Sequence, residues 1–181
     1  MSVIAETMTG LQVGQKAPDF NAQALMSDGS FKDVKLSEYK GKWVVLFFYP
    51  LDFTFVCPTE IQGFNKHIQE FKQLNAEIIG ASTDSVYSHK AWSDAGLGKV
   101  QFPILGDTNH RVARSFNVLL EDKGIALRGT FIIDPNGVLK SAVVNDLPVG
   151  RSVEETLRTL QALQTGKLTG CGWQPGEKTL N

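Results

Sequence analysis

Apolar residues in this chain occur in two patterns, short continuous runs and helical periodicities. Residues 43–49 read WVVLFFY and residues 76–82 read AEIIGAS, and such runs are typical of strands covered on both faces of a sheet. Between them, apolar residues recur every three or four positions from Ile61 to Leu74. This spacing predicts an amphipathic helix from Pro58 to about Leu74.

The following segments predict two more helices and a hairpin. We expect helices over residues 85–95 and 107–116. Residues 130–133 and 138–144 are strand-like, and the Pro-Asn-Gly between them supplies turn chemistry, so the pair predicts a β-hairpin. Strands that alternate with helices and end in a hairpin indicate an α/β fold, a mixed sheet flanked by helices.

The last predicted helix begins at Ser152, which forms a capping box with Glu155. Its apolar face consists of Val153, Leu157, Leu160 and Leu163. Residues 164–181 then contain four glycines and a proline, a composition that favours an arm over a core element. We therefore expect a domain over residues 1–163 and a mobile glycine-rich arm over residues 164–181.

Length and charge exclude several classes of protein. A chain of 181 residues favours one domain with a substantial core. The formal net charge of −1 provides no basic surface, so we expect no nucleic-acid partner. The opening residues have no signal-peptide pattern, and no stretch of about 18 uninterrupted apolar residues occurs, so we expect no membrane partner and a cytoplasmic location. Two cysteines are too few for a secreted disulfide scaffold.

One of the two cysteines lies where chemistry is expected, between the apolar run and the first helix. Pro58 suits the first helical position, which makes Cys57 the predicted N-cap. There the sulfur faces unpaired backbone N–H groups and the positive end of the helix dipole, which favour thiolate over thiol. Thr54 offers a hydroxyl that can donate to the thiolate, and Pro50 can shield the sulfur.

Other interpretations of Cys57 are weaker or remain open. A free cysteine taken by itself is a buried packing residue about as often as not, but the strand–loop–helix setting with Thr54, Pro58 and Glu60 weighs against that interpretation. A redox C-x-x-C motif is excluded because Glu60 occupies the second position. The cysteines and histidines show no metal-ligand spacing, so we expect no metal. A cysteine protease needs a histidine base, for which only His110 comes into question.

The same residues resemble a known family. Pro50-x-x-x-Thr54-x-x-Cys57 reproduces the P-x-x-x-T-x-x-C motif of the peroxiredoxins. The resemblance continues through most of the chain, in the blocks VGQKAPDF, HKAW, LRGTFIIDPNG, LPVGRSVEETLR and CGWQPG. Together they are similar to the typical two-cysteine peroxiredoxins, the group that contains the peroxidase component of bacterial alkyl hydroperoxide reductase. This resemblance implies a thioredoxin-like fold.

By this resemblance, Cys57 is the peroxidatic cysteine and Cys171 the resolving cysteine. Arg128 takes the place of the arginine that cradles the thiolate and the peroxide oxygens. A fixed cation there would stabilise the charge that moves onto the peroxide. Without the resemblance, Arg128 would more often be a solvated charge at a strand end.

Three further residues match family positions around this arginine. Glu60 and Arg151 match residues that orient Arg128, although a helix-cap carboxylate and a surface cation explain each one alone. Trp92 matches an aromatic residue near the active-site loop, and core packing accounts for it equally well.

The resemblance also implies an activity. Hydrogen peroxide and alkyl hydroperoxides would oxidise Cys57 to a sulfenic acid, which Cys171 from the other chain of a dimer would convert to a disulfide. Thioredoxin or another dithiol reductase would then reduce the bridge, with no cofactor. The expected assembly is an antiparallel homodimer or a ring-shaped decamer. A chaperone-like oligomer and a redox relay to a partner protein remain alternatives to the antioxidant enzyme.

Overall fold

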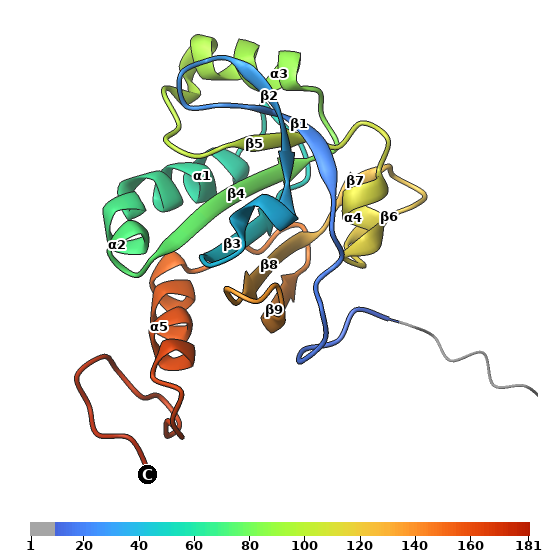
Figure 1. Ribbon diagram of the computed structural model, residues 1–181. Coiled ribbons are helices and arrows are strands. Elements are labelled where there is room, and N and C mark those ends of the chain that lie inside the picture. The colour runs from blue at the N-terminus through green and yellow to red at the C-terminus, as the bar shows by residue number, and fades with distance from the viewer. Residues whose placement is uncertain (1–9) are drawn as a thin grey trace, which may run out of the picture.

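A computed structural model describes residues 10–181 (Figure 1), so residues 1–9, on which the expected lack of a signal peptide depends, lie outside it. Its centre is a seven-stranded mixed sheet with the strand order β2-β1-β5-β4-β3-β8-β9. The strands are β1 (Asn21–Leu25), β2 (Phe31–Lys35), β3 (Trp43–Phe48), β4 (Ala76–Ser82), β5 (Ile104–Gly106), β8 (Arg128–Ile133) and β9 (Leu139–Asn145). A separate two-stranded ribbon consists of β6 (Leu119–Leu120) and β7 (Ile125–Ala126).

Helices cover both faces of this sheet. They are α1 (Cys57–Lys66), α2 (Ile68–Gln73), α3 (Val86–Trp92), α4 (Arg111–Ser115) and α5 (Val153–Gln164), with a 3-10 turn η1 (Leu36–Tyr39) and a π-helical turn η2 (Ser93–Leu97). Helices α1, α2 and α5 pack on one face, and α4 packs on the other. The expected α/β architecture of a mixed sheet flanked by helices is therefore confirmed. No helix in residues 10–181 is long and apolar enough to cross a membrane.

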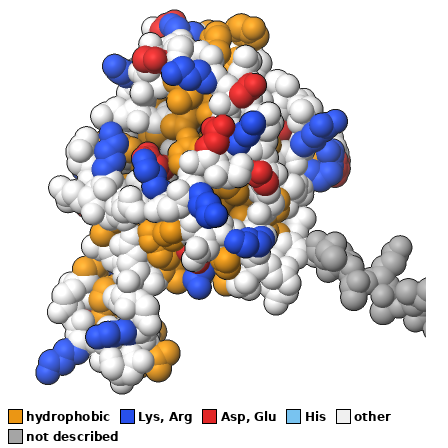
Figure 2. All heavy atoms as spheres, viewed as in Figure 1, with side chains coloured by type: hydrophobic (Ala, Val, Ile, Leu, Met, Phe, Trp, Pro, Cys, Tyr) orange, Lys and Arg blue, Asp and Glu red, His pale blue; other side chains and the backbone are white. Residues whose placement is uncertain are grey.

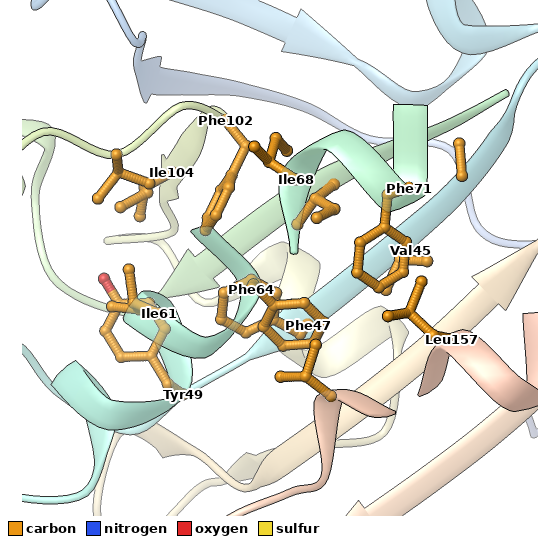
Figure 3. Packing of buried hydrophobic residues seen from close by; sticks show 14 of the residues in the cluster. Val45, Phe47, Tyr49, Ile61, Phe64, Ile68, Phe71, Phe102, Ile104 and Leu157 are labelled. Carbon is orange, nitrogen blue, oxygen red and sulfur yellow. The ribbon is translucent and has the colours of Figure 1, made fainter. Parts of the chain in front are cut away.

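Strand β3 is the centre of the core, as its continuous apolar run predicts. Its residues from Val44 on are at most 1% exposed and alternate between the two layers. On the side of α1, the ring of Phe47 stacks on Phe64 with their centroids 4.4 Å apart (Figure 3). β3 runs parallel to β4 and antiparallel to β8, with Phe47 paired to Thr130. This register brings the start of β8, Arg128, to the end of β3 where the Cys57 loop begins.

The helix predicted from Pro58 to Leu74 is interrupted. His67 leaves helical geometry, with φ −93° and ψ 10°, and separates α1 from α2. Its Nδ1 lies 2.6 Å from Glu70 Oε1, so the ring binds the first turn of α2. Apolar periodicity continues across the break, because Phe64 and Phe71 both pack in the same core cluster. The pattern could therefore not reveal the interruption.

The helix predicted over residues 107–116 is shorter than expected. His110 has a left-handed φ of 61°, so the helix begins only at Arg111. The carboxylate of Asp107 instead accepts the backbone N–H groups of Val112 and Ala113, at 3.1 and 2.7 Å. Asp107 thus caps α4 from outside the helix.

The remaining predicted elements occur with small shifts. Ser85 caps α3 by accepting from Ser88 N at 3.2 Å, and the helix continues as the π-helical turn η2. Strands β8 and β9 form the predicted hairpin. Ser152 Oγ accepts from Glu155 N at 3.0 Å, which is one half of the predicted capping box. The Glu155 carboxylate binds Arg158 instead, at 2.6 and 2.7 Å.

Candidate active site

Cys57 is the first residue of α1 and lies at the end of the loop that follows β3. The N-cap is Val56, so the prediction that Cys57 caps the helix is wrong by one residue. Val56 already has helical angles, and its carbonyl accepts from Thr59 N and Glu60 N at 3.0 and 3.3 Å. Cys57 still lies in the first turn, at the positive end of the helix dipole.

A guanidinium group faces the buried sulfur. The Cys57 side chain is fully buried, and Arg128 Nη1 lies 3.5 Å from its Sγ. Arg128 reaches this point from the first position of β8, and its Nε donates to the Leu147 carbonyl at 2.6 Å. A hydrogen bond at each end of the guanidinium fixes its orientation toward the sulfur.

Glu60 connects the two arginines of the site. Its Oε2 lies 2.6 Å from Arg128 Nη1, and its Oε1 lies 2.9 Å from Arg151 Nε. Arg151 N also donates to Oε1, at 3.1 Å. All three side chains are at most 5% exposed. The carboxylate of Glu60, one helical turn after Cys57, therefore holds both guanidinium groups inside the protein.

Arg151 is enclosed by acceptors and an aromatic ring. It donates to the carbonyls of Phe48 and Gly129 and to the hydroxyl of Thr130. The guanidinium carbon lies 5.2 Å from the centroid of the Phe47 ring. Burial lowers the pKa of Arg151 because desolvation disfavours its charged form, and the ion pair with Glu60 opposes that shift. Arg151 is thus a buried structural cation and not a surface charge.

The formal charges of this cluster balance when the cysteine is ionised. Arg128 and Arg151 supply two positive charges, and Glu60 supplies one negative charge. With a neutral thiol, the buried group would carry one uncompensated positive charge, which is costly in a low-dielectric interior. A thiolate at Cys57 would complete this charge balance, and the thiolate is the form of cysteine that acts as a nucleophile.

Pro50 and Thr54 precede Cys57 in the same loop. Pro50 is buried directly after β3, and Thr54 is half-buried. Within residues 10–181, the Thr54 hydroxyl donates to the Leu51 carbonyl at 3.0 Å and not to the cysteine, which differs from the expected contact. Because its proton is used there, the oxygen of Thr54 is left to accept a hydrogen bond from a bound molecule.

Trp92 ends α3 and packs in the core cluster that contains Cys57. It is 6% exposed, and its ring centroid lies 5.8 Å from that of Phe53 in the active-site loop and 6.3 Å from that of Tyr49. Trp92 therefore both packs in the core and contacts the active-site loop, as the two interpretations of the sequence expected.

Cys171 is an exposed free thiol in the segment after α5, whereas Cys57 is a buried one. Figure 2 shows this segment projecting from the body of the molecule beyond α5. Trp173 is 6% exposed, and its carbonyl accepts from Arg158 Nη1 at 2.9 Å. Arg158 lies in the middle of α5, so this contact folds the Cys171 segment back against the helix.

Several contacts of the site have no sequence signature. The carbonyls that hold the arginines, from Phe48, Gly129 and Leu147, are backbone groups that any residue would supply. A buried pair of Asp52 and His89 also adjoins the loop. Its only signal was that both residues lie in stretches that resemble the family. Within residues 10–181, no group of His, Cys, Asp and Glu side chains has the arrangement of a metal site.

Comparison with known proteins agrees with this geometry. The model of the AhpC/TSA family matches residues 13–142. Peroxiredoxin prdx-2 of Caenorhabditis elegans is 53% identical over 186 residues, which cover 98% of this chain and 92% of the relative. Thioredoxin peroxidase of Echinococcus granulosus is 53% identical over 176 residues, which cover 92% of this chain and 91% of the relative.

A solved structure extends the comparison to the fold. The reduced 2-Cys peroxiredoxin of Plasmodium vivax matches with a TM-score of 0.89 and 40% identity, covering 92% of this chain and 91% of that chain. This likeness confirms the expected thioredoxin-like fold. The chain therefore belongs to the peroxiredoxins, the thiol peroxidases of the AhpC/TSA family.

Proposed function

We propose that this protein reduces hydrogen peroxide and alkyl hydroperoxides with Cys57 as the nucleophile. The observation that carries the proposal is the buried Cys57 Sγ, 3.5 Å from Arg128 Nη1 in a cluster whose charges balance with a thiolate. The thiolate attacks one peroxide oxygen and the O–O bond breaks. Sulfur is oxidised to a sulfenic acid, and the departing oxygen takes a proton and leaves as water or alcohol.

Arg128 and Thr54 bind the peroxide during this step. The Arg128 guanidinium carries donors toward the sulfur and stabilises the negative charge that grows on the departing oxygen. The Thr54 oxygen accepts a hydrogen bond from the peroxide O–H and thereby aligns the O–O bond with the sulfur. Pro50 shields the sulfur from water, and Glu60 and Arg151 keep Arg128 in place.

The second step forms a disulfide between two copies of the chain. The Cys171 thiol attacks the sulfenic sulfur, an S–S bond forms and water leaves. A disulfide requires Cα atoms within about 7 Å. Buried Cys57 can meet this requirement only if the first turn of α1 unwinds. Cys171 from the other chain of a homodimer is the proposed partner, as the resemblance to the typical two-cysteine peroxiredoxins implies.

A dithiol protein completes the cycle by thiol–disulfide exchange, and it takes up the two oxidising equivalents that the peroxide delivered. Thioredoxin is the proposed reductant, which the name of the Echinococcus granulosus thioredoxin peroxidase supports. The cycle needs a reducing compartment such as the cytoplasm. Homodimers of this kind could further assemble into a ring-shaped decamer.

A coupled assay with thioredoxin, thioredoxin reductase and NADPH tests the proposal. We expect NADPH consumption that depends on peroxide in the parent protein, and none in Cys57→Ser. Cys171→Ser should consume about one equivalent of peroxide and then stop, because resolution fails. No peroxide-dependent consumption with any dithiol reductant would contradict the proposal. Transfer of the disulfide to a different protein in place of thioredoxin would favour the redox relay.

A further inference from the structure

A second buried polar network adjoins the active-site loop at Asp52, four residues before Val56. Its centre is the pair of Asp52 and His89, whose side chains are 1% and 0% exposed and whose Oδ2 and Nδ1 atoms lie 2.7 Å apart. The other ring nitrogen, Nε2, donates to the Leu105 carbonyl at 3.0 Å. The imidazole thus joins the loop to β5 through the interior of the molecule.

Both carboxylate oxygens of Asp52 are engaged. Tyr49 Oη donates to its Oδ1 at 2.8 Å, and Ser88 Oγ donates to its Oδ2 at 2.7 Å. Its own backbone N–H donates to Asp84 Oδ2 at 2.7 Å. Burial raises the pKa of Tyr49 well above its ordinary value, which keeps this hydroxyl a donor. The loop is therefore held at Asp52 by Tyr49, which directly follows β3, by α3 and by the turn after β4.

The loop is weakly held after this point. Phe53 has a left-handed φ of 55°, a conformation that is unusual for an aromatic residue and needs support from its surroundings. Phe55 is 96% exposed. Within residues 10–181, the only side-chain hydrogen bond from residues 53–56 is that of Thr54 to the Leu51 carbonyl, which stays inside the loop. Asp52 is thus the last residue before Cys57 whose side chain is hydrogen-bonded to elements outside the loop.

We propose that Asp52 and His89 are positioning residues of the peroxidase reaction: they fix the start of the active-site loop, and so set Thr54 and Cys57 for oxidation and mark where unwinding begins. This inference rests on the proposed function. Release of Asp52 lets Phe53 leave its left-handed conformation and turns the loop away from Arg128. Oxidation of Cys57 then slows, whereas disulfide formation, which needs the unwound loop, does not.

A positioning role predicts that oxidation of Cys57 slows while disulfide formation does not, whereas a loss of stability alone would slow both steps. We expect Asp52→Ala to slow peroxide oxidation of Cys57 by about tenfold or more, the cost of losing hydrogen bonds to a charged group. Oxidation is measured by stopped flow in the Cys171→Ser background, and disulfide formation is measured with both cysteines present. Asp52→Asn should restore oxidation to about the parent rate, because an amide can accept from Tyr49 and donate to a neutral His89 ring.

The matched control is Asp107→Ala, which removes a buried carboxylate that caps α4 outside the loop. Its oxidation and disulfide rates should both stay within about twofold of the parent after correction for the folded fraction. If Asp52→Ala does not fold, His89→Leu tests the same link, since it leaves Asp52 with two hydroxyl donors. Parent-like oxidation in the folded variant, or equal slowing of both steps, would overturn the proposal.

Hydrogen exchange of the reduced protein separates this inference from the peroxidase function, because no peroxide is present. The backbone N–H of residue 52, which donates to Asp84 Oδ2 in the parent, should exchange about tenfold faster in Asp52→Ala and His89→Leu than in the parent and Asp107→Ala. Unchanged exchange in both loop variants would overturn the anchoring role whatever the enzyme does. Faster exchange in a protein whose Cys57 does not react with peroxide would overturn the proposed function instead.

Discussion

Glu60 and Arg128 form an ion pair inside the protein, with Oε2 and Nη1 2.6 Å apart and side chains 2% and 5% exposed. The second oxygen of Glu60 binds Arg151, so one carboxylate serves two cations. The position of Arg128 beside Cys57 is therefore not a property of Arg128 alone. It depends on a residue one turn further along the same helix as the cysteine.

Removal of the Glu60 charge should destabilise the fold. Glu60→Gln keeps the shape of the side chain but removes the carboxylate charge that pairs with both buried guanidinium groups. Breaking a buried ion pair in this way typically costs about 3–5 kcal/mol, which urea unfolding of the reduced protein would measure. Glu154→Gln removes a carboxylate that is 75% exposed and should change stability by less than about 0.5 kcal/mol. Equal midpoints for the two variants would refute the structural importance of the cluster.

The oxidised protein should form covalent dimers. If Cys57 of one chain pairs with Cys171 of another, as proposed, treatment with one equivalent of peroxide should produce a dimer band on a non-reducing denaturing gel. Reductant should remove the band, and neither Cys57→Ser nor Cys171→Ser should produce the full doubly bridged species. A monomer band that contains no free thiols would show that the disulfide forms within one chain.

Arg158 should hold the segment that carries Cys171. It donates to the Trp173 carbonyl at 2.9 Å and is itself bound by both oxygens of Glu155. Arg158→Ala removes a hydrogen bond from a charged donor, so local opening should become about tenfold more frequent. Chymotryptic cleavage after Trp173 measures this opening. The control Arg114→Ala breaks an exposed ion pair with Glu121 and should leave the cleavage rate unchanged.

Stability should fall in alkaline solution. Burial raises the pKa of Tyr49 well above 10, and partial burial with the charges of Glu77 and Glu38 raises that of Tyr39 to about 12. The unfolded chain therefore loses these tyrosyl protons first, so stability is complete below pH 10 and declines as the pH rises above it. Tyr49→Phe should flatten this decline in chemical unfolding experiments. An equally steep decline in Tyr49→Phe and the parent would show that Tyr49 does not cause it.

The sequence predicts the buried centre of the fold better than its edges. β3 and β4 are recognisable because they are apolar on both faces, and α5 because Ser152 marks its start. β1 and β2 were not predicted, since as strands near the edge they carry polar residues and show no long apolar run. β5 has only three residues, too few for a pattern.

The active site could be predicted only in part for a physical reason. Its residues come from separate elements, and the spacing of Cys57, Arg128 and Arg151 contains no local pattern that would bring them together. The resemblance supplied that grouping, whereas the carbonyl partners and the Asp52–His89 pair required coordinates. The N-cap was predicted one residue too late, at Cys57, for a similar reason. Pro58 alone does not reveal that Val56 already has helical angles.

The most direct test of the account is the rate at which peroxide oxidises Cys57 in the Cys171→Ser protein. One oxygen atom should be added to Cys57 and trapped as a sulfenic acid. Arg128→Ala should slow this step by about 100- to 1,000-fold, the usual cost of removing one electrostatic donor from a transition state. Arg111→Ala, which removes an exposed arginine, should react at the parent rate. A Cys57 that remains unmodified, or an Arg128→Ala protein that is oxidised as fast as the parent, would contradict the account.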